Sequence, residues 1–421
     1  MRAASFTVIA VLVVLAARFV GPLLPFSFSI DLAGDAVYSI LQIIATAMLT
    51  VSTFSVTAMV TAFSAATTTA TPRATQLLIA DPTSQNAVST FIGAFTFSLV
   101  GIIALSTGYY GGQGRTILFV ATLVIIGIVV FTLLRWISHL STFGRMADVI
   151  DRVETAAGAS LERHAESPTL GARPGVAVPP VTAAVHAEDV GYVTHIDVAG
   201  LDRLTHRHDI DIHVRATPGR MTDARLPLAE VVGDVDHDVV AGVRRAFRVE
   251  NHRTYEQDPR FGVIALSEIG SRALSPSTND PGTAIEVLAA LQRVLTRALR
   301  VDARPEVEYE RVYVTAPRLP DLLDDGFRPL ARDGATIIEV QIRLQKCLAS
   351  LAATAPDRAG VFRDAARAAY ERSRRELDRA DRRTLRAAVR EAWGTEGVRR
   401  SSPTRSPDMS GGSCDPRILG P

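Results

Sequence analysis

The first 144 residues carry almost no charge, and this constrains the fold more than any other feature of the chain. The sequence has 45 Lys and Arg and 44 Asp and Glu residues, 89 in all, yet only eight of them precede Arg145. These eight are Arg2, Arg18, Asp31, Asp35, Arg73, Asp81, Arg115 and Arg135. Burying an unpaired charge in hydrocarbon costs several kcal/mol, whereas a water-soluble fold has no need to avoid charge. The N-terminal third is therefore expected to lie in a lipid bilayer.

Four segments of this region are long and apolar enough to cross a membrane. A bilayer core about 30 Å thick takes roughly 20 apolar helical residues. The four segments are residues 3–24, 37–63, 87–106 and 116–137. We therefore predict a membrane α-helical bundle of about four transmembrane helices, in residues 1–145, followed by a cytosolic α+β domain with a small β-rich unit and amphipathic helices.

The loops between these segments predict the orientation of the bundle. Lys and Arg are retained on the cytoplasmic side of a membrane. Arg2 precedes the first segment, Arg73 follows the second, Arg135 lies at the end of the fourth and Arg145 follows it. The two opposite loops carry Asp31 and Asp35 and a single Arg115. Both termini of this multi-pass protein are therefore expected to be cytoplasmic, which in a bacterium makes the inner (plasma) membrane its location.

The second segment has hydroxyl side chains at intervals of three or four residues, which places them on one helix face. They belong to Thr46, Thr50, Thr53, Thr57, Thr61 and Ser64. Such residues can bond to carbonyl groups one turn earlier or pack against a neighbouring helix. Alternatively, they can line a hydrated pore. We favour packing, because no acidic or basic side chain accompanies the hydroxyl stripe. A second surface of small residues, including Ser89, Gly93 and Gly101, is also expected to pack.

The remaining residues divide into four parts by composition. Residues 146–184 read as a polar helix followed by a linker rich in Pro, Gly and Ala, which favours an extended spacer. Residues 185–248 form a β-rich subdomain, in which alternating patterns predict strands at 191–198, 209–214 and 226–232 around a helix at 201–205. Residues 249–393 are mainly helical. Residues 394–421 are predicted to be a disordered tail.

Within residues 249–393 the patterns predict helices at 261–274, from 281 to about 299, 318–328, 337–353 and 359–392, with one strand at 307–315. Asp280 before Pro281 is a signal for the start of a helix, and so is Asp81 before Pro82.

The connector between the helices at 261–274 and 281–299 is rich in polar groups. It reads Ser275-Pro-Ser-Thr-Asn-Asp-Pro281. Its simplest role is a hydrogen-bonded turn that fixes the angle between the two helices. The functional alternative is a site for a polar or anionic ligand at the start of the second helix. The candidate ligand-binding residues are Arg253, Arg272, Asn279 and Asp280.

Composition argues against several other functions. A net charge of +1 provides no cationic excess for nucleic acid. Two cysteines cannot form a disulfide framework, and His206, His208 and His213 lack further residues at ligand spacing, so we predict neither a metal site nor a cofactor. We find no nucleophile elbow, phosphate-binding loop or dinucleotide fingerprint, so we do not expect an enzyme.

Five segments together carry a resemblance to a known family. They are Ser52-Thr-Phe-Ser-Val-Thr-Ala58, Pro72-Arg73, Gly191-Tyr-Val-Thr-His-Ile-Asp197, Arg253-Thr-Tyr-Glu-Gln-Asp258 and Arg272-Ala-Leu-Ser-Pro-Ser-Thr-Asn-Asp-Pro281. From the second membrane segment to about residue 392, the sequence resembles the bacterial family of predicted membrane proteins called domain of unknown function 2254 (DUF2254). The resemblance implies a membrane location and this architecture, and it implies no activity.

Two functions therefore remain open. The first is a membrane-anchored module whose cytosolic domain binds an unknown small polar or anionic ligand or a partner. The second is a channel or transporter formed by a homo-oligomer, with a pore lined by the hydroxyl stripe.

Overall fold

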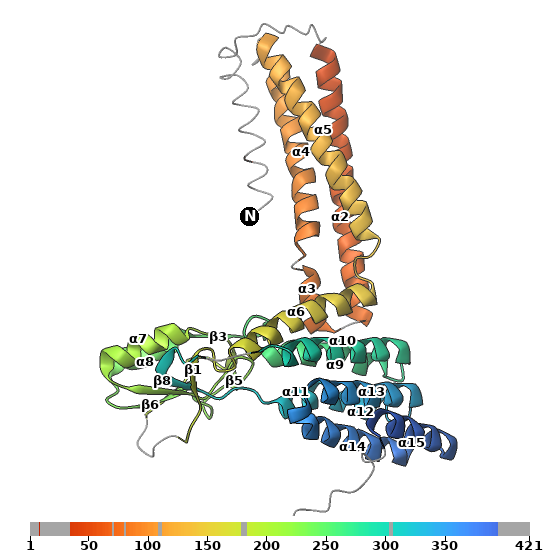
Figure 1. Ribbon diagram of the computed structural model, residues 1–421. Coiled ribbons are helices and arrows are strands. Elements are labelled where there is room, and N and C mark those ends of the chain that lie inside the picture. The colour runs from red at the N-terminus through yellow and green to blue at the C-terminus, as the bar shows by residue number, and fades with distance from the viewer. Residues whose placement is uncertain are drawn as a thin grey trace, which may run out of the picture.

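In the computed structural model, three helices have the length and composition of membrane spans. The structure describes residue 8 and residues 34–69, 71–79, 81–107, 112–177, 183–302 and 306–394. The three helices are α2 (Gly34–Thr69), α4 (Pro82–Ser106) and α5 (Gly112–Leu140), which form a bundle (Figure 1). They cover three of the four predicted spans. The predicted first span, at 3–24, and the predicted tail beyond residue 394 lie outside the described residues.

Helix α4 packs against both α2 and α5. Its buried face includes the small residues Ser89, Gly93, Ser98 and Gly101. A Cβ atom at Gly101 would lie only 3.0 Å from Cδ1 of Leu41 on α2, so the missing side chain lets the two helices approach closely. The prediction that these small residues pack is confirmed.

Two further helices connect the bundle to the rest of the chain. Helix α3 (Pro72–Ile79) lies between α2 and α4, and Asp81 then caps α4 by accepting a hydrogen bond of 2.7 Å from the amide of Ser84. Helix α6 (Met146–Glu166) is the first helix of the extramembrane domain, residues 146–394, and lies between the bundle and the rest of that domain (Figure 1). Asp81 thus has the capping role that the sequence predicts.

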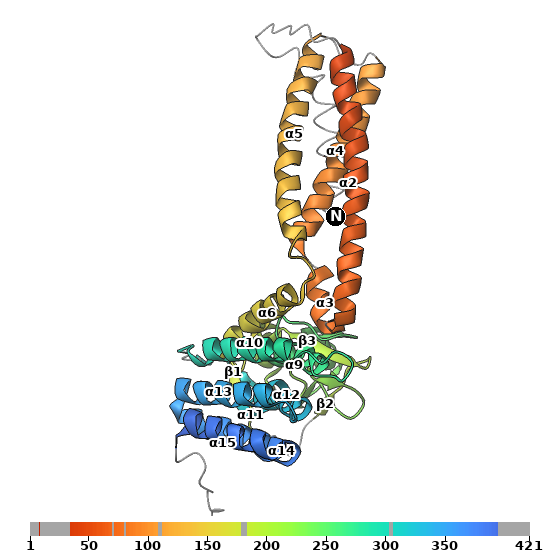
Figure 2. The same ribbon diagram turned by 90° about the vertical axis from the view of Figure 1, so that its right-hand side faces the viewer.

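Below α6, the helices of the extramembrane domain stack in layers (Figure 2). The first layer is α9 (Pro259–Ala273) with α10 (Pro281–Leu299). The others contain α11 (Leu319–Gly326), α12 (Arg328–Asp333), α13 (Ile338–Thr354), α14 (Ala359–Glu376) and α15 (Arg379–Trp393), with a short 3₁₀ turn, η2 (Pro356–Arg358), before α14. One apolar core runs through α6 and these layers up to α14. In it, burial raises the pKa of the Cys347 thiol to about 11.

The prediction of a single helix at 359–392 is wrong, because the chain breaks between α14 and α15. The carboxylate of Asp378 accepts hydrogen bonds of 2.7 and 2.9 Å from the amides of Ala380 and Asp381. This cap starts a new helix and lets α15 pack back onto α13. A periodic charge pattern cannot distinguish this pair from one long helix.

A separate α/β unit lies beside the helical layers (Figure 1). Its larger sheet has the order β1-β8-β4-β6-β2, and its smaller sheet has the order β5-β3-β7. The strands are β1 (Ala172–Pro174), β2 (Ala183–Val185), β3 (Gly191–Ile196), β4 (Asp211–Val214), β5 (Met221–Thr222), β6 (Ala229–Val232), β7 (Phe247–Glu250) and β8 (Tyr309–Val314). Helices α7 (Val198–His208) and α8 (His237–Ala246) complete the unit and contribute to its own apolar core.

The larger sheet recruits strands from outside residues 185–248. Strand β8 pairs in parallel with β4, placing Ile212 beside Val312, and β1 pairs in parallel with the other edge of β8. The chain thus leaves the α/β unit after β7, forms α9 and α10, and returns as β8. It then leaves again for α11, and it had first entered the unit from α6, so the chain passes between the helices and the α/β unit four times.

The crossing of α6 over α9 depends on Gly262. A Cβ atom there would lie 2.4 Å from Cβ and 2.6 Å from Cα of Ala157, so neither helix can give way without moving its backbone.

We predict that Gly262→Ala destabilises the protein by about 1–3 kcal/mol through overpacking. The readout is the melting temperature of the full chain in mild detergent. The matched control is Gly360→Ala in α14, where a Cβ atom meets nothing within 4 Å and should be neutral or slightly stabilising. Equal melting temperatures for both variants would contradict the close crossing.

Candidate functional site

The segment 251–258 between β7 and α9, which we call the junction segment, touches every part of the molecule around it. It contains all of Arg253–Asp258, one of the five segments that carry the family resemblance. Its side chains and backbone contact α3 next to the membrane bundle, α6, strand β3 and the start of α9. We take this segment as the candidate functional site, because it joins the membrane bundle to the extramembrane domain.

Asp258 anchors the junction segment to α9. Its side chain is 1% exposed, and it accepts hydrogen bonds from the amides of Arg260 and Phe261 at 3.1 and 3.2 Å. Nε of Arg253 donates to the same carboxylate at 2.7 Å, and the guanidinium lies 5.3 Å from the centre of the Phe261 ring. The charge of Arg253 is therefore already paired inside the fold.

The turn before strand β5 also fits against Asp258. Gly219 has φ of +88°, and a Cβ atom there would lie 2.3 Å from Oδ2 of Asp258. Only glycine combines this left-handed backbone with so close an approach. The turn at Pro218-Gly219 thus packs against the capped start of α9.

Tyr255 and Arg73 connect the junction segment to the membrane half. Oη of Tyr255 donates a hydrogen bond of 3.1 Å to the carbonyl of Arg73 on α3. Burial and the neighbouring Glu268 carboxylate raise the pKa of Tyr255, so the phenol keeps its proton at neutral pH and remains a donor. The guanidinium of Arg73 forms an ion pair with Glu268 on α9. Sequence spacing instead suggests that Glu268 pairs with Arg272 four residues later.

Glu256 and Gln257 bind α6 and β3 by hydrogen bonds. Nη2 of Arg163 on α6 donates to the carbonyl of Glu256 at 2.8 Å. The side-chain amide of Gln257 accepts from the backbone N–H of Ile196 at 2.9 Å and lies 3.5 Å from the Ile196 carbonyl. Gln257 therefore offers β3 the pairing that a neighbouring strand would provide.

Helix α6 is tied to the bundle by a cluster of charges around Asp81. The buried carboxylate of Asp81 accepts from Nη1 of Arg152 at 2.9 Å and lies 3.0 Å from Nε2 of His139 at the end of α5. Nε of Arg152 also lies 3.0 Å from both oxygens of Asp148. Two residues after Arg152, Glu154 accepts a hydrogen bond of 2.9 Å from Nε of Arg293 on α10, and Glu162 lies 3.1 Å from Nε of Arg297. Helix α6 therefore binds the bundle through Arg152 and α10 through Glu154 and Glu162.

The structure separates the four predicted ligand-binding residues. Arg253 lies before α9, whereas Arg272 lies in its last turn and Asn279 and Asp280 follow. Fifteen helical residues span about 22 Å, so Arg253 does not share a site with the other three.

The connector between α9 and α10 is an ordered turn. Asn279 has φ of +49°, and the amide of Asp280 donates to the carbonyl of Ala273 at 2.8 Å. Asp280 caps α10, accepting from the amide of Thr283 at 3.1 Å and its hydroxyl at 2.6 Å. The predicted capping role of Asp280 is confirmed. Arg272, Asn279 and Asp280 are exposed on this turn.

The histidines considered as metal ligands point to different surroundings. His213 is buried and stacks on Tyr313, with 4.4 Å between ring centres, whereas His206 is exposed and lies beside Asp202. Within the ranges that the structure describes, no group of three or more His, Cys, Asp or Glu side chains is arranged to hold a metal ion.

The six hydroxyl side chains of α2 all lie on its exposed side. Four of them, on Thr46, Thr50, Thr53 and Thr57, donate to the carbonyl four residues earlier at 2.9–3.0 Å. An open recess of about 630 Å³ lies along the same face, next to Thr46 and Thr50.

The anchoring role of Asp258 is testable by substitution. Asp258→Asn removes the charge that pairs with Arg253 and should cost about 2 kcal/mol. That loss lowers the melting temperature of the full chain in detergent by about 4–8 °C. The control is Glu188→Gln, which breaks the exposed 3.1 Å pair with Arg244 and should cost less than about 0.5 kcal/mol. Similar losses in both variants would show that Asp258 is no more than a surface partner.

Comparison with known proteins supports the membrane architecture. The profile of a family described as "Predicted membrane protein (DUF2254)" matches residues 1–350. The uncharacterized proteins Rv1290c of Mycobacterium tuberculosis and Mb1321c of Mycobacterium bovis are each 33% identical to the chain over 168 residues. That alignment covers 38% of this chain but only 32% of each relative's length. No solved structure matches the chain. Because the family profile extends over most of the sequence, the chain belongs to the DUF2254 family of predicted membrane proteins.

Proposed function

We propose that this protein is a membrane-anchored regulatory module, in which a cytosolic domain binds a small polar or anionic ligand and transmits the event to the transmembrane helices. The junction segment is the observation that carries this proposal. Its four consecutive residues from Tyr255 to Asp258 contact α3, α6, β3 and α9 in turn. A domain that was only tethered to the membrane would not need these contacts. A flexible linker would be sufficient for that.

The contacts of the junction segment favour transmission of small movements. A shift of the α/β unit moves β3, which is bonded to Gln257, and the neighbouring Tyr255 is bonded to α3. Packed helices slide or rotate as units, since interiors at native density do not deform continuously. Movement of α3 or α6 then reaches α4 and α5 through the charge cluster at Asp81.

The charges at the ends of the bundle support the proposed orientation. Arg73 and Arg145 lie at the end that carries the extramembrane domain, whereas Arg115 lies near the start of α5, at the opposite end (Figure 1). The excess of Arg on the domain side is typical of the cytoplasmic face. We therefore propose an inner-membrane protein with both termini and the large domain in the bacterial cytoplasm.

In this proposal the protein is not an enzyme, and its partners are the lipid bilayer, the ligand and further copies of itself. Nucleic acid is not among them. The exposed turn with Arg272, Asn279 and Asp280 is one candidate for ligand contact, and Arg253 contributes through the junction instead.

Coupling through the junction is testable by distance measurement. Spin labels on cysteines replacing Leu134 in α5 and Asp238 in α8 report the position of the α/β unit relative to the bundle. Both positions are exposed. The background carries Cys414→Ser, so that buried Cys347 is the only native cysteine left. In lipid nanodiscs we expect one narrow distribution of the distance between the two labels. The double variant Tyr255→Phe/Glu268→Gln should broaden it, because both bridges to α3 weaken. Glu188→Gln serves as the control, and an unchanged width in the double variant would refute coupling through this segment.

A channel or transporter is the second candidate function, and the outward position of all six hydroxyl side chains of α2 favours it. Four of these side chains satisfy their donors within the helix, so the face can meet either lipid or a second copy of the chain. In a homo-oligomer with α2 facing the central axis, the hydroxyl stripe and the recess beside it would line a pore.

Cysteine accessibility separates this candidate from packing in lipid. In a pore, cysteines replacing Thr53 and Thr57 are modified by a charged, membrane-impermeant thiosulfonate reagent, whereas one replacing the exposed Phe54 on a neighbouring face is not. Protection of all three cysteines in intact membranes would exclude a pore along this stripe.

A further inference from the structure

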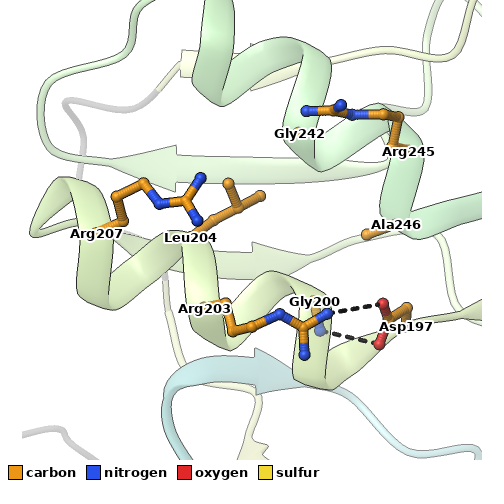
Figure 3. A pocket seen from close by; sticks show the side chains of 8 residues that line it. All are labelled: Asp197, Gly200, Arg203, Leu204, Arg207, Gly242, Arg245 and Ala246. Carbon is orange, nitrogen blue, oxygen red and sulfur yellow. Dashed lines mark hydrogen bonds and ion pairs between the residues drawn. The ribbon is translucent and has the colours of Figure 1, made fainter.

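A pocket lined by arginines lies between α7 and α8 in the α/β unit. It has a volume of about 200 Å³ and contains Arg203 and Arg207 from α7 and Arg245 from α8 (Figure 3). Leu204 and Gly242 lie between them, and Asp197 closes one end. A Cβ atom at Gly242 would lie 2.7 Å from Cδ2 of Leu204. The absence of a side chain at Gly242 therefore lets α7 and α8 pack closely beneath the pocket.

The cations of this pocket exceed its anions. Within the part of the chain that the structure describes, no hydrogen bond or ion pair is made by the guanidinium of Arg207 or of Arg245. Arg203 has a loose contact of 3.5 Å with Asp197, whose other oxygen accepts a hydrogen bond of 2.9 Å from the amide of Gly200. Three positive charges therefore share one hollow with a single carboxylate that is already engaged.

Helix dipoles explain part of this arrangement. Arg207 lies in the last turn of α7 and Arg245 in the last turn of α8, where a cation is favoured by the partial negative charge of the helix end. That effect accounts for each residue alone. It does not account for the position of all three arginines around one pocket, because like charges that line one hollow repel each other.

We propose that this pocket binds a small anion through its phosphate group. A guanidinium presents paired N–H donors that match phosphate oxygens, and a phosphate carries up to two negative charges against the three cations. The volume suits a small phosphate ester or pyrophosphate rather than a peptide chain. This inference rests on the proposed function, since it names the chemistry of the ligand that the cytosolic domain would sense.

Two sources can supply such a group. Helices α7 and α8 lie on the side of the sheet towards the membrane bundle (Figure 1). A phospholipid headgroup and a soluble phosphate ester can therefore both reach the pocket between these helices. The recognition chemistry is the same for both, and the experiment distinguishes them.

The probe is inorganic pyrophosphate, titrated by calorimetry into the full chain in nanodiscs of neutral phosphatidylcholine at low salt. We expect saturable binding that weakens as salt screens the charges. The double variant Arg207→Gln/Arg245→Gln should bind at least tenfold more weakly, because each substitution removes one charge-assisted contact. The matched control is Arg383→Gln/Arg386→Gln, which removes two exposed charges from α15, and it should bind like the parent.

Absence of saturable binding in the parent, or an equal loss in both double variants, would overturn the proposal. Nanodiscs containing about one fifth phosphatidylglycerol identify the source. If the anionic lipid weakens pyrophosphate binding to the parent, headgroups occupy the pocket; if binding is unchanged, the pocket takes a soluble ligand. The spin-label distances measure coupling separately, so pyrophosphate binding can fail while the junction still proves to control the domain.

Discussion

The cost of placing charge in hydrocarbon governs this structure. It confines the first part of the chain to helices whose backbone groups are satisfied internally, and it moves nearly all charged side chains into the extramembrane domain. Contacts between the two parts must then be made by the few polar groups left at the edge of the bundle. Arg73 and Asp81 are two of the eight charges before Arg145, and each is used in such a contact.

This scarcity gives α3 and α6 their importance. Helix α3 holds its place through Arg73, which binds Glu268 and, through its carbonyl, Tyr255. Helix α6 reaches the bundle through Arg152 and the extramembrane core through its apolar face. The extramembrane domain is therefore held against the bundle by specific bonds of α3 and α6. Such an arrangement suits a protein in which events in the domain and in the membrane influence each other.

The α/β unit and the helical layers have separate apolar cores, and the junction segment lies where they meet. Two parts with separate cores can shift relative to each other at less cost than one continuous core can deform. The arginine pocket lies in the α/β unit, and Asp197 at one end of it follows Ile196, to which Gln257 of the junction segment is bonded. A ligand there would act through the position of the whole unit, not through direct contact with the membrane helices.

The sequence alone determined the membrane helices and much of the secondary structure, because both arise from local patterns. Long apolar runs predicted α2, α4 and α5, and alternating residues predicted β3, β4 and β6. Asp-Pro pairs placed the starts of α4 and α10. A carboxylate before a proline caps the helix that follows in almost any context, so no tertiary information was needed.

Only the tertiary structure decided which of these elements meet. Periodicity within a helix suggests a partner four residues away for Glu268, but its partner is Arg73, 195 residues earlier in the chain. Likewise, the sequence analysis groups Arg253 and Arg272 in one candidate site, yet α9 holds them at its opposite ends. The pairing of β8 with β4 is also a tertiary feature, and Arg203, Arg207 and Arg245 line one pocket only because α7 and α8 pack together. Long-range contacts of this kind leave no periodic signal, because the entropy of closing the intervening loops is offset only by the assembled core.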